Sequence, residues 1–244
     1  MSDSNSLKPL LLPHSGVRRW LLSESTRLQL AVWGVALPLL IVSLLTALVW
    51  GRDGGIGWDE LILLAIHKTL QPSLDTLAAV LSELGVYRGV FPAVIAIAVG
   101  LLAARRWRLL IYVLTVAVGE MLINRTAKIL IHRPRPHLWE TPYPQHTDFA
   151  FPSGHAMASM TFAVIVIVLT WRSRWNWVVT GLSSLFVAGV SWSRLYLGVH
   201  YPSDILAGWF AAIAWATVVN LALLSQQPVE DDDTQNPSGA SNST

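Results

Sequence analysis

Long apolar segments are the feature that most constrains how this chain can fold. Six of them carry few charged residues, and they lie at 28–50, 86–104, 108–131, 155–171, 176–197 and 203–224. Crossing the ~30 Å hydrocarbon core of a bilayer takes about 20 residues of α-helix. Lipid offers the backbone no hydrogen-bond partners, so a spanning segment must satisfy its own N–H and C=O groups. The pattern therefore predicts an all-α protein, a bundle of six transmembrane helices.

The composition also favours a membrane protein over a soluble domain. Hydrophobic residues make up 53% of the chain, charged residues only 13%, and the mean hydropathy is +0.49. A soluble domain carries about 25% charged residues. The formal net charge of +2 is too small to indicate a nucleic-acid partner. The chain has no Cys and no HExxH-like spacing, so we expect neither a metal site nor another cofactor.

The remaining segments suggest how the chain is organised. Between the first two apolar segments, the stretch from 59 to 85 is amphipathic, and it is interrupted at Gln71-Pro72-Ser73. This pattern predicts two short helices at the membrane interface. Residues 1–27 are expected to be a cytoplasmic N-terminal arm, and residues 28–225 the membrane domain. Residues 226–244, which are acidic and rich in small polar residues, are expected to be a disordered cytoplasmic tail.

Three short polar strings stand at the ends of the apolar segments. They are Lys128-x6-Arg135-Pro136, Pro152-Ser153-Gly154-His155 and Ser193-Arg194-x5-His200-x3-Asp204. At 1.5 Å per residue, the third segment carries Lys128 across the bilayer from the start of its helix. His155 opens the fourth segment, Arg194 ends the fifth and His200 precedes the sixth. Alternating spans therefore bring all three strings to the same membrane face.

The distribution of Lys and Arg predicts the orientation of the bundle. Nine basic residues lie on one side, namely Lys8, Arg18, Arg19, Arg27, Arg105, Arg106, Arg108, Arg172 and Arg174. Apart from the polar strings, the other side has Arg52, Lys68 and Arg88. The positive-inside rule places both termini in the cytoplasm of a multi-pass plasma (inner) membrane protein. The three strings then face the non-cytoplasmic side.

The cations of these strings favour phosphoryl transfer. A phosphoryl group in transfer spreads negative charge over its equatorial oxygens, so catalysis needs fixed positive groups around it. Arg135 and Arg194 are planar donors that can each bind two oxygens, and Lys128 adds a point charge. Ser153 and Gly154 stand where a loop becomes a helix, and free N–H groups at such a position bind anions. We expect these five residues to bind phosphate.

Two histidines and one carboxylate can supply the chemistry. His200 is the preferred nucleophile, because the chain has no Cys and Ser153 has no base close in sequence. Asp204 lies one helical turn further on, where it can hold one ring nitrogen of His200 as N–H and leave the other free to attack. His155 is then left to protonate the leaving group and later to activate water.

With these residues, the chain resembles the type 2 phosphatidic acid phosphatase superfamily, which also includes vanadium haloperoxidases and bacterial acid phosphatases. The resemblance runs from Lys128 to Asp204 and covers every signature residue and spacing, and the six-span layout is similar to the membrane lipid phosphatase branch. Of two Arg-Pro pairs, only Arg135-Pro136, and not Arg133-Pro134, has the family spacing from Lys128. The resemblance implies a phosphohistidine intermediate, no metal and a site open to the outer leaflet. It gives the eight residues discussed above the same roles.

The expected function is hydrolysis of lipid phosphate or diphosphate monoesters by an integral membrane enzyme. Undecaprenyl diphosphate is the preferred substrate, followed by phosphatidic acid or phosphatidylglycerol phosphate, and the oligomeric state is left open. A membrane transporter of anions or lipids is the main alternative, although spans four to six carry no cation in their middle. A haloperoxidase would hold vanadate on the same residues, but those relatives are soluble.

Each string taken alone has a simpler interpretation. Lys128 could be a cation that snorkels at a helix end, and His200 with Asp204 could be a capped helix start. The occurrence of all three strings on one face favours the enzyme. Glu120 lies in the middle of the third span, where a carboxylate is costly. We expect it to have a structural role, bonding Asn124 or another helix.

Overall fold

The computed structural model describes residues 24–139 and 148–224, and every regular element within them is helical. One continuous helix comprises α2 (Glu24–Ala31), the π-helical turn η1 (Val32–Ala36) and α3 (Leu37–Val49). The other helices are α4 (Gly57–His67), α5 (Pro72–Leu84), α6 (Val90–Ala103), α7 (Trp107–Ile131), α8 (Gly154–Thr170), α9 (Asn176–Tyr196) and α10 (Pro202–Leu223). The predicted all-α class is confirmed.

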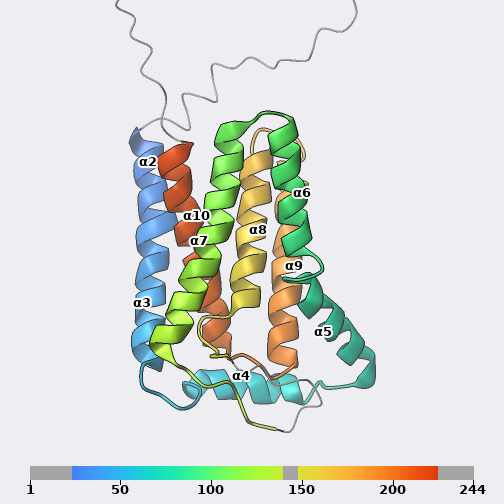
Figure 1. Cartoon of the computed structure of the whole chain (residues 1–244). Coiled ribbons are helices and arrows are strands. Elements are labelled where there is room, and N and C mark those ends of the chain that lie inside the picture. Colours follow the sequence, from blue (N-terminus) through green and yellow to red (C-terminus); the bar gives the residue numbers. More distant parts are fainter. Residues whose placement is uncertain (1–23, 140–147, 225–244) are drawn as a thin grey trace, which may run out of the picture.

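The long helices form an elongated bundle. Helices α3, α6, α7, α8, α9 and α10 run side by side, α4 lies across one end, and α5 slants away from the bundle (Figure 1). The start of α2, the end of α10 and the α6–α7 turn lie at the opposite end (Figure 1). Each helix begins and ends within a few residues of the apolar segment that predicted it.

Four helices are long and apolar enough to cross a membrane, namely Glu24–Val49, α7, α9 and α10. Helices α6 and α8 are apolar but shorter, with 14 and 17 residues. The chain is thus a helical membrane protein, and the six crossings expected from the sequence stay a prediction. Two helices, α4 and α5, do occupy the stretch from 59 to 85, with the break at Gln71.

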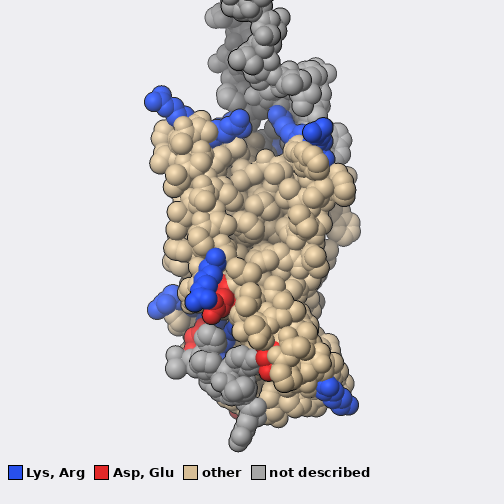
Figure 2. All heavy atoms as spheres, turned by 90° about the vertical axis from the view of Figure 1, so that its right-hand side faces the viewer, with Lys and Arg blue, Asp and Glu red and all other residues tan. Residues whose placement is uncertain are grey.

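The outer surface of the bundle is apolar. Large side chains such as Leu40, Leu44 and Leu185 expose more than half of their surface. On the face shown in Figure 2, a wide belt without charged residues separates Lys and Arg at one end from mixed charges toward the other. Such a belt suits contact with lipid rather than with water. Most of the predicted arm at 1–27 and the whole predicted tail at 226–244 lie outside the described residues.

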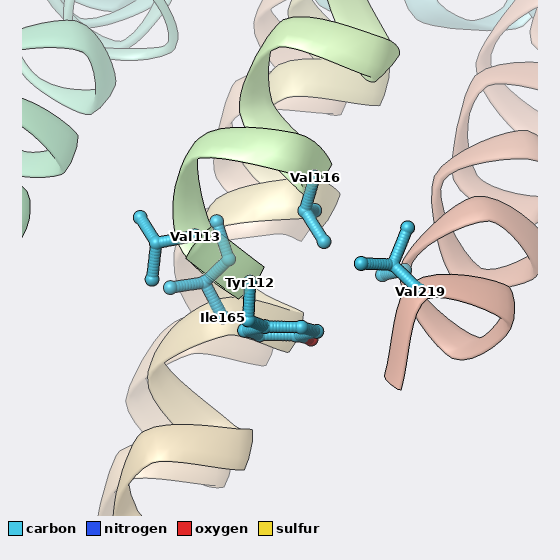
Figure 3. Close-up of a cluster of buried hydrophobic side chains, with 6 residues drawn as sticks. Tyr112, Val113, Val116, Ile165 and Val219 are labelled. Atoms are coloured by element: carbon cyan, nitrogen blue, oxygen red, sulfur yellow. The ribbon is translucent and has the colours of Figure 1, made fainter. Parts of the chain in front are cut away.

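A cluster of buried hydrophobic side chains from three helices packs the interior of the bundle. Tyr112, Val113 and Val116 of α7 meet Ile165 of α8 and Val219 of α10 in one cluster (Figure 3). All of these side chains are buried, four of them completely. The cluster fixes the spacing of α7, α8 and α10, and these three helices carry two of the polar strings and part of the third.

A glycine on α10 allows the closest approach between these elements. A Cβ added at Gly208 would lie 2.8 Å from the carbonyl oxygen of Ser153, which is too near for any side chain. The turn before α8 can therefore rest directly against the first turns of α10. This contact sets the distance between the second and third polar strings.

Candidate active site

The three polar strings meet at the end of the bundle that α4 crosses (Figure 1). Lys128 lies in the last turn of α7, and Arg135 follows it in an extended segment. His155 is in the first turn of α8, and Arg194 is in the last turn of α9. Asp204 is in the first turn of α10. The expectation that all three strings share one end of the bundle is thus met by the fold.

His200 lies between a carboxylate and a guanidinium. Its Nδ1 atom is 3.4 Å from Asp204 Oδ2, and its Nε2 atom is 3.2 Å from Arg135 Nη1. A guanidinium can only donate, so these partners assign the proton to Nδ1 and the lone pair to Nε2. The ring is 1% exposed. The nitrogen that carries the lone pair therefore faces the cation that is expected to hold phosphate.

The surroundings of His200 keep its ring neutral. Burial is the largest cause, and the charges of Arg135, Arg194, Lys128 and His155 add to it, so that the pKa of His200 lies well below its ordinary 6.5. A neutral imidazole has a lone pair available for attack at physiological pH.

A carboxylate from the loop before α8 pairs with two of the predicted phosphate-binding residues. Asp148 Oδ2 is 2.7 Å from Lys128 Nζ, and Asp148 Oδ1 is 2.6 Å from Arg135 Nη2. Lys128 also donates to the carbonyl of Phe149, and Arg135 to that of Val199 at 2.8 Å. The Asp148 carboxylate thus binds the cations as two oxygens of a phosphate would. Burial opposes its ionisation, but the hydrogen bond from Lys128 and both cationic charges lower the pKa of Asp148 to about 2.

Removing this carboxylate is expected to tighten anion binding. In Asp148→Asn, Lys128 and Arg135 lose an internal competitor, so we expect the inhibition constants of vanadate and inorganic phosphate to fall about 3- to 10-fold, which corresponds to roughly 1 kcal/mol. Inhibition of the purified enzyme measures this. Glu83→Gln is the matched control, because Glu83 forms an exposed pair with Arg88 at 2.5 Å. Weaker inhibition in Asp148→Asn would mean that the carboxylate organises the cations rather than competing for them.

The turn before α8 is fixed by its own polar groups. The Ser153 amide donates to the Asp204 carbonyl at 3.0 Å, and its hydroxyl accepts from the Ala156 amide at 3.5 Å. Because its hydroxyl accepts from the Ala156 amide, Ser153 is the N-cap of α8, and it is fully buried. Asn124 donates to the Pro152 carbonyl at 3.2 Å, and the structural role expected for Glu120 stays a prediction. The Ser153 hydroxyl keeps its own O–H to donate, and the amide of Gly154, the first residue of α8, has no acceptor within the helix, so both groups can donate to an anion.

Arg194 is held by a residue that the sequence did not single out. Arg194 is 3% exposed, and its guanidinium donates to Ser82 Oγ on α5 at 2.5 Å. Helix α5 therefore helps to position Arg194, whose charge lowers the pKa of His200. Other contributors missed from the sequence are Arg133 and Asp59, which lie behind Asp204.

Positive groups dominate the front of this site. Within residues 24–139 and 148–224, no group of three or more His, Cys, Asp or Glu side chains is arranged to hold a metal ion. Lys128, Arg135 and Arg194 can instead supply the charge that stabilises a phosphoryl group.

Comparisons with known proteins agree with this geometry. A family model described as the PAP2 superfamily matches residues 108–227, which include every predicted site residue. A phosphatidylglycerophosphatase B of Bacillus subtilis is 31% identical over 156 residues, covering 62% of this chain and 75% of the relative. The chain belongs to the PAP2 superfamily.

Two further relatives cover more of this PAP2 chain. An undecaprenyl-diphosphatase of Sulfolobus acidocaldarius is 28% identical over 203 residues, covering 81% of this chain and 93% of the relative. The crystal structure of a transmembrane PAP2-type phosphatidylglycerolphosphate phosphatase from Bacillus subtilis superposes with a TM-score of 0.68 at 27% identity. That match covers 77% of this chain and 94% of the other. The similarity to PAP2 proteins thus extends beyond the signature to most of the bundle.

Proposed function

We propose that this chain, a membrane lipid phosphatase of the PAP2 superfamily, hydrolyses lipid phosphate or diphosphate monoesters through a phosphohistidine at His200. The observation that carries the proposal is the position of His200, with Nδ1 toward Asp204 and Nε2 toward Arg135. This arrangement presents a neutral nucleophile to a cationic pocket for the phosphoryl group.

The reaction proceeds in two displacements. The terminal phosphoryl group of the substrate binds to Lys128, Arg135 and Arg194, and Nε2 of His200 attacks its phosphorus while the bond to the leaving oxygen breaks. This oxygen is the lipid oxygen of a monophosphate or the bridging oxygen of a diphosphate. His155 gives its proton to that oxygen, and Asp204 stabilises the positive imidazole. His155 then takes a proton from water, which attacks phosphorus and releases phosphate from His200.

Undecaprenyl diphosphate is the substrate we favour. The relative named undecaprenyl-diphosphatase covers 81% of this chain, whereas the phosphatidylglycerophosphatase B of Bacillus subtilis covers 62%. Phosphatidylglycerol phosphate comes next and phosphatidic acid third. The signature binds the phosphoryl group that all three share, so the choice among them is made by how the lipid chains fit the apolar surface of the bundle.

A panel assay tests this function. We expect the purified protein to release phosphate from undecaprenyl diphosphate faster than from the two glycerolipids, to keep its activity in EDTA, and to be inhibited by vanadate, which mimics five-coordinate phosphorus. Loss of turnover in EDTA with recovery on adding Mg²⁺ would contradict the mechanism. Transport of phosphate or lipid by proteoliposomes without hydrolysis would favour the transporter instead.

The proposal includes a topology with six crossings. Helices α6 and α8 would span about 21 and 26 Å at 1.5 Å per residue, which a tilted bundle and local thinning of the bilayer can accommodate. Residues 28–225 form the membrane domain, with α4 and α5 at the outer interface and both termini in the cytoplasm. The basic α6–α7 and α8–α9 turns at the end opposite the site support a site on the non-cytoplasmic side.

Cysteine labelling tests the orientation, because the chain has no Cys of its own. Thr69 is exposed between α4 and α5, and Ser173 is exposed between α8 and α9. In intact cells, a membrane-impermeant thiol reagent should label Thr69→Cys and leave Ser173→Cys unlabelled until the cells are opened. The reverse pattern would place the site in the cytoplasm.

A further inference from the structure

Arg133 is a buried cation shared between two carboxylates. Its side chain has no exposed surface, and neither do the side chains of Asp59 and Asp204. Arg133 Nη1 is 2.5 Å from Asp204 Oδ1, and Nη2 is 2.8 Å from Asp59 Oδ2. The ring of Tyr201 lies under the guanidinium, with its centroid 4.3 Å from Cζ. Arg133 therefore joins the segment after α7 to α4 and α10.

Asp59 holds the far side of this guanidinium in place. Its Oδ2 atom accepts from the Ser203 hydroxyl at 2.6 Å and from the Ile56 amide at 3.2 Å, and its Oδ1 atom accepts from the Ser203 amide at 2.8 Å. Both carboxylate oxygens of Asp59 are thus engaged, by Ser203 of α10 and by the Ile56 amide just before α4. A carboxylate bound in this way has one orientation, and so does the arginine that it contacts.

Asp204 is oriented chiefly by groups other than the histidine it faces. Arg133 takes Oδ1, and the Tyr201 amide donates to Oδ2 at 2.9 Å. The contact from Oδ2 to His200 Nδ1 is longer, at 3.4 Å. Because the bonds from Arg133 and Tyr201 are shorter than the contact with His200, they determine the plane of the Asp204 carboxylate. The imidazole is then aligned by a carboxylate that cannot turn away.

The charges of this cluster also suit the reaction. With both carboxylates ionised, Asp59, Asp204 and Arg133 carry two negative charges and one positive charge. The cluster behind a neutral His200 is therefore net negative. When the imidazole becomes positive on forming a bond to phosphorus, the local sum becomes zero, so the cluster stabilises the charge that develops. A fold alone has no need of this arrangement, because buried ion pairs can often be replaced by apolar groups without loss of stability.

We propose that Arg133, anchored by Asp59, is a positioning residue for phosphoryl transfer that fixes the Asp204 carboxylate against His200. Of the two Arg-Pro pairs, the first would then orient the nucleophile from behind and the second would bind phosphate in front. The inference rests on the proposed function, in which His200 is the nucleophile.

The test compares Arg133→Lys and Asp59→Asn with the wild type as purified, full-length protein. Lysine keeps the charge but lacks the planar fork that fixes the two carboxylates relative to each other, and asparagine keeps the shape but not the charge. The readouts are kcat, KM, and the rate of acid-labile ³²P labelling per folded molecule during turnover. Tyr196→Phe is the matched control, because it removes a partly buried bond between α9 and α5, from the Tyr196 hydroxyl to Asp75 at 2.8 Å.

We expect Arg133→Lys to lower kcat and the labelling rate about 10- to 100-fold, the usual size for loss of an orienting partner, with KM changed less than about 3-fold. Asp59→Asn should show a smaller loss of the same kind, and Tyr196→Phe none. A wild-type labelling rate in folded Arg133→Lys, or a change confined to KM, would overturn the positioning role alone. Label that survives in His200→Ala would overturn the proposed function and this inference with it.

Discussion

Replacing His200 with alanine is expected to abolish phosphate release from every substrate, by at least about 10⁴-fold in kcat. The reason is that His200 is proposed to form the covalent phosphohistidine intermediate. Without Nε2, the nitrogen that faces Arg135 and is proposed to accept the phosphoryl group is lost, and the remaining cations can only bind that group. The measurement is phosphate release by purified protein at saturating substrate, together with the amount of acid-labile ³²P on the protein.

His137→Ala is the matched control, because His137 is an exposed histidine two residues after Arg135. This variant should retain full activity, which separates loss of the nucleophile from loss of any histidine near the site. Since His200 is buried, folding of His200→Ala is checked by its thermal transition and by binding of inorganic phosphate, which needs only the cations. Residual turnover within about 10-fold of the wild type would remove His200 from the reaction.

Replacing His155 with alanine is expected to give a loss that depends on the leaving group. An alkoxide leaving from a lipid phosphate needs a proton, so kcat should fall about 10²- to 10⁴-fold. The aryl oxide of an aryl phosphate can leave without being protonated, so formation of the phosphoenzyme from that substrate should be much less affected. The comparison is kcat for a short-chain lipid phosphate against kcat for an aryl phosphate in the same preparation.

The two histidine variants also differ in what accumulates. Because His155 is expected to activate water in the second step, His155→Ala acting on an aryl phosphate should accumulate labelled protein, whereas His200→Ala should not. Equal losses for both substrates in His155→Ala would mean that this residue binds phosphate and transfers no proton.

Much of the fold could be predicted because membrane helices are encoded locally. An apolar segment must satisfy its own backbone hydrogen bonds, so its length alone sets the helix. The segment 108–131 became α7 over Trp107–Ile131, and 176–197 became α9 over Asn176–Tyr196. The break at Gln71 was also predictable, since Pro72 stands at the first position of α5.

The front of the site was predictable for a different reason. The helices run up and down the bundle and bring the end of α7 and the start of α10 to one end, so Arg135 and His200 meet although 65 residues separate them. The predicted role of Ser153 in binding phosphate stays a prediction, because its hydroxyl accepts from the Ala156 amide and keeps its own O–H to donate, while its amide donates to the Asp204 carbonyl. That contact depends on the close approach at Gly208, which no local pattern specifies.

The back of the site could not be predicted. Arg133 and Asp59 are 74 residues apart, and Asp59 meets Ser203 across 144 residues. On sequence grounds Asp59 is only one of several charges in an amphipathic stretch, and an acidic residue in the first turn of a helix is explained by the helix dipole. The Arg133-Pro134 pair was visible, but its spacing from Lys128 differs from that of Arg135. Only the three-dimensional structure shows that Arg133 pairs with Asp59 and Asp204.

The most direct test of the central claim is to locate the phosphoryl group on the protein during turnover. The enzyme is mixed with labelled lipid phosphate, quenched in base to preserve phosphohistidine, and digested, and the labelled peptide is identified by mass spectrometry. Phosphorus NMR of the intermediate then distinguishes the two ring nitrogens. The geometry predicts the label on Nε2 of His200, the nitrogen 3.2 Å from Arg135. A label on His155, on a serine or on Nδ1 of His200 would contradict it.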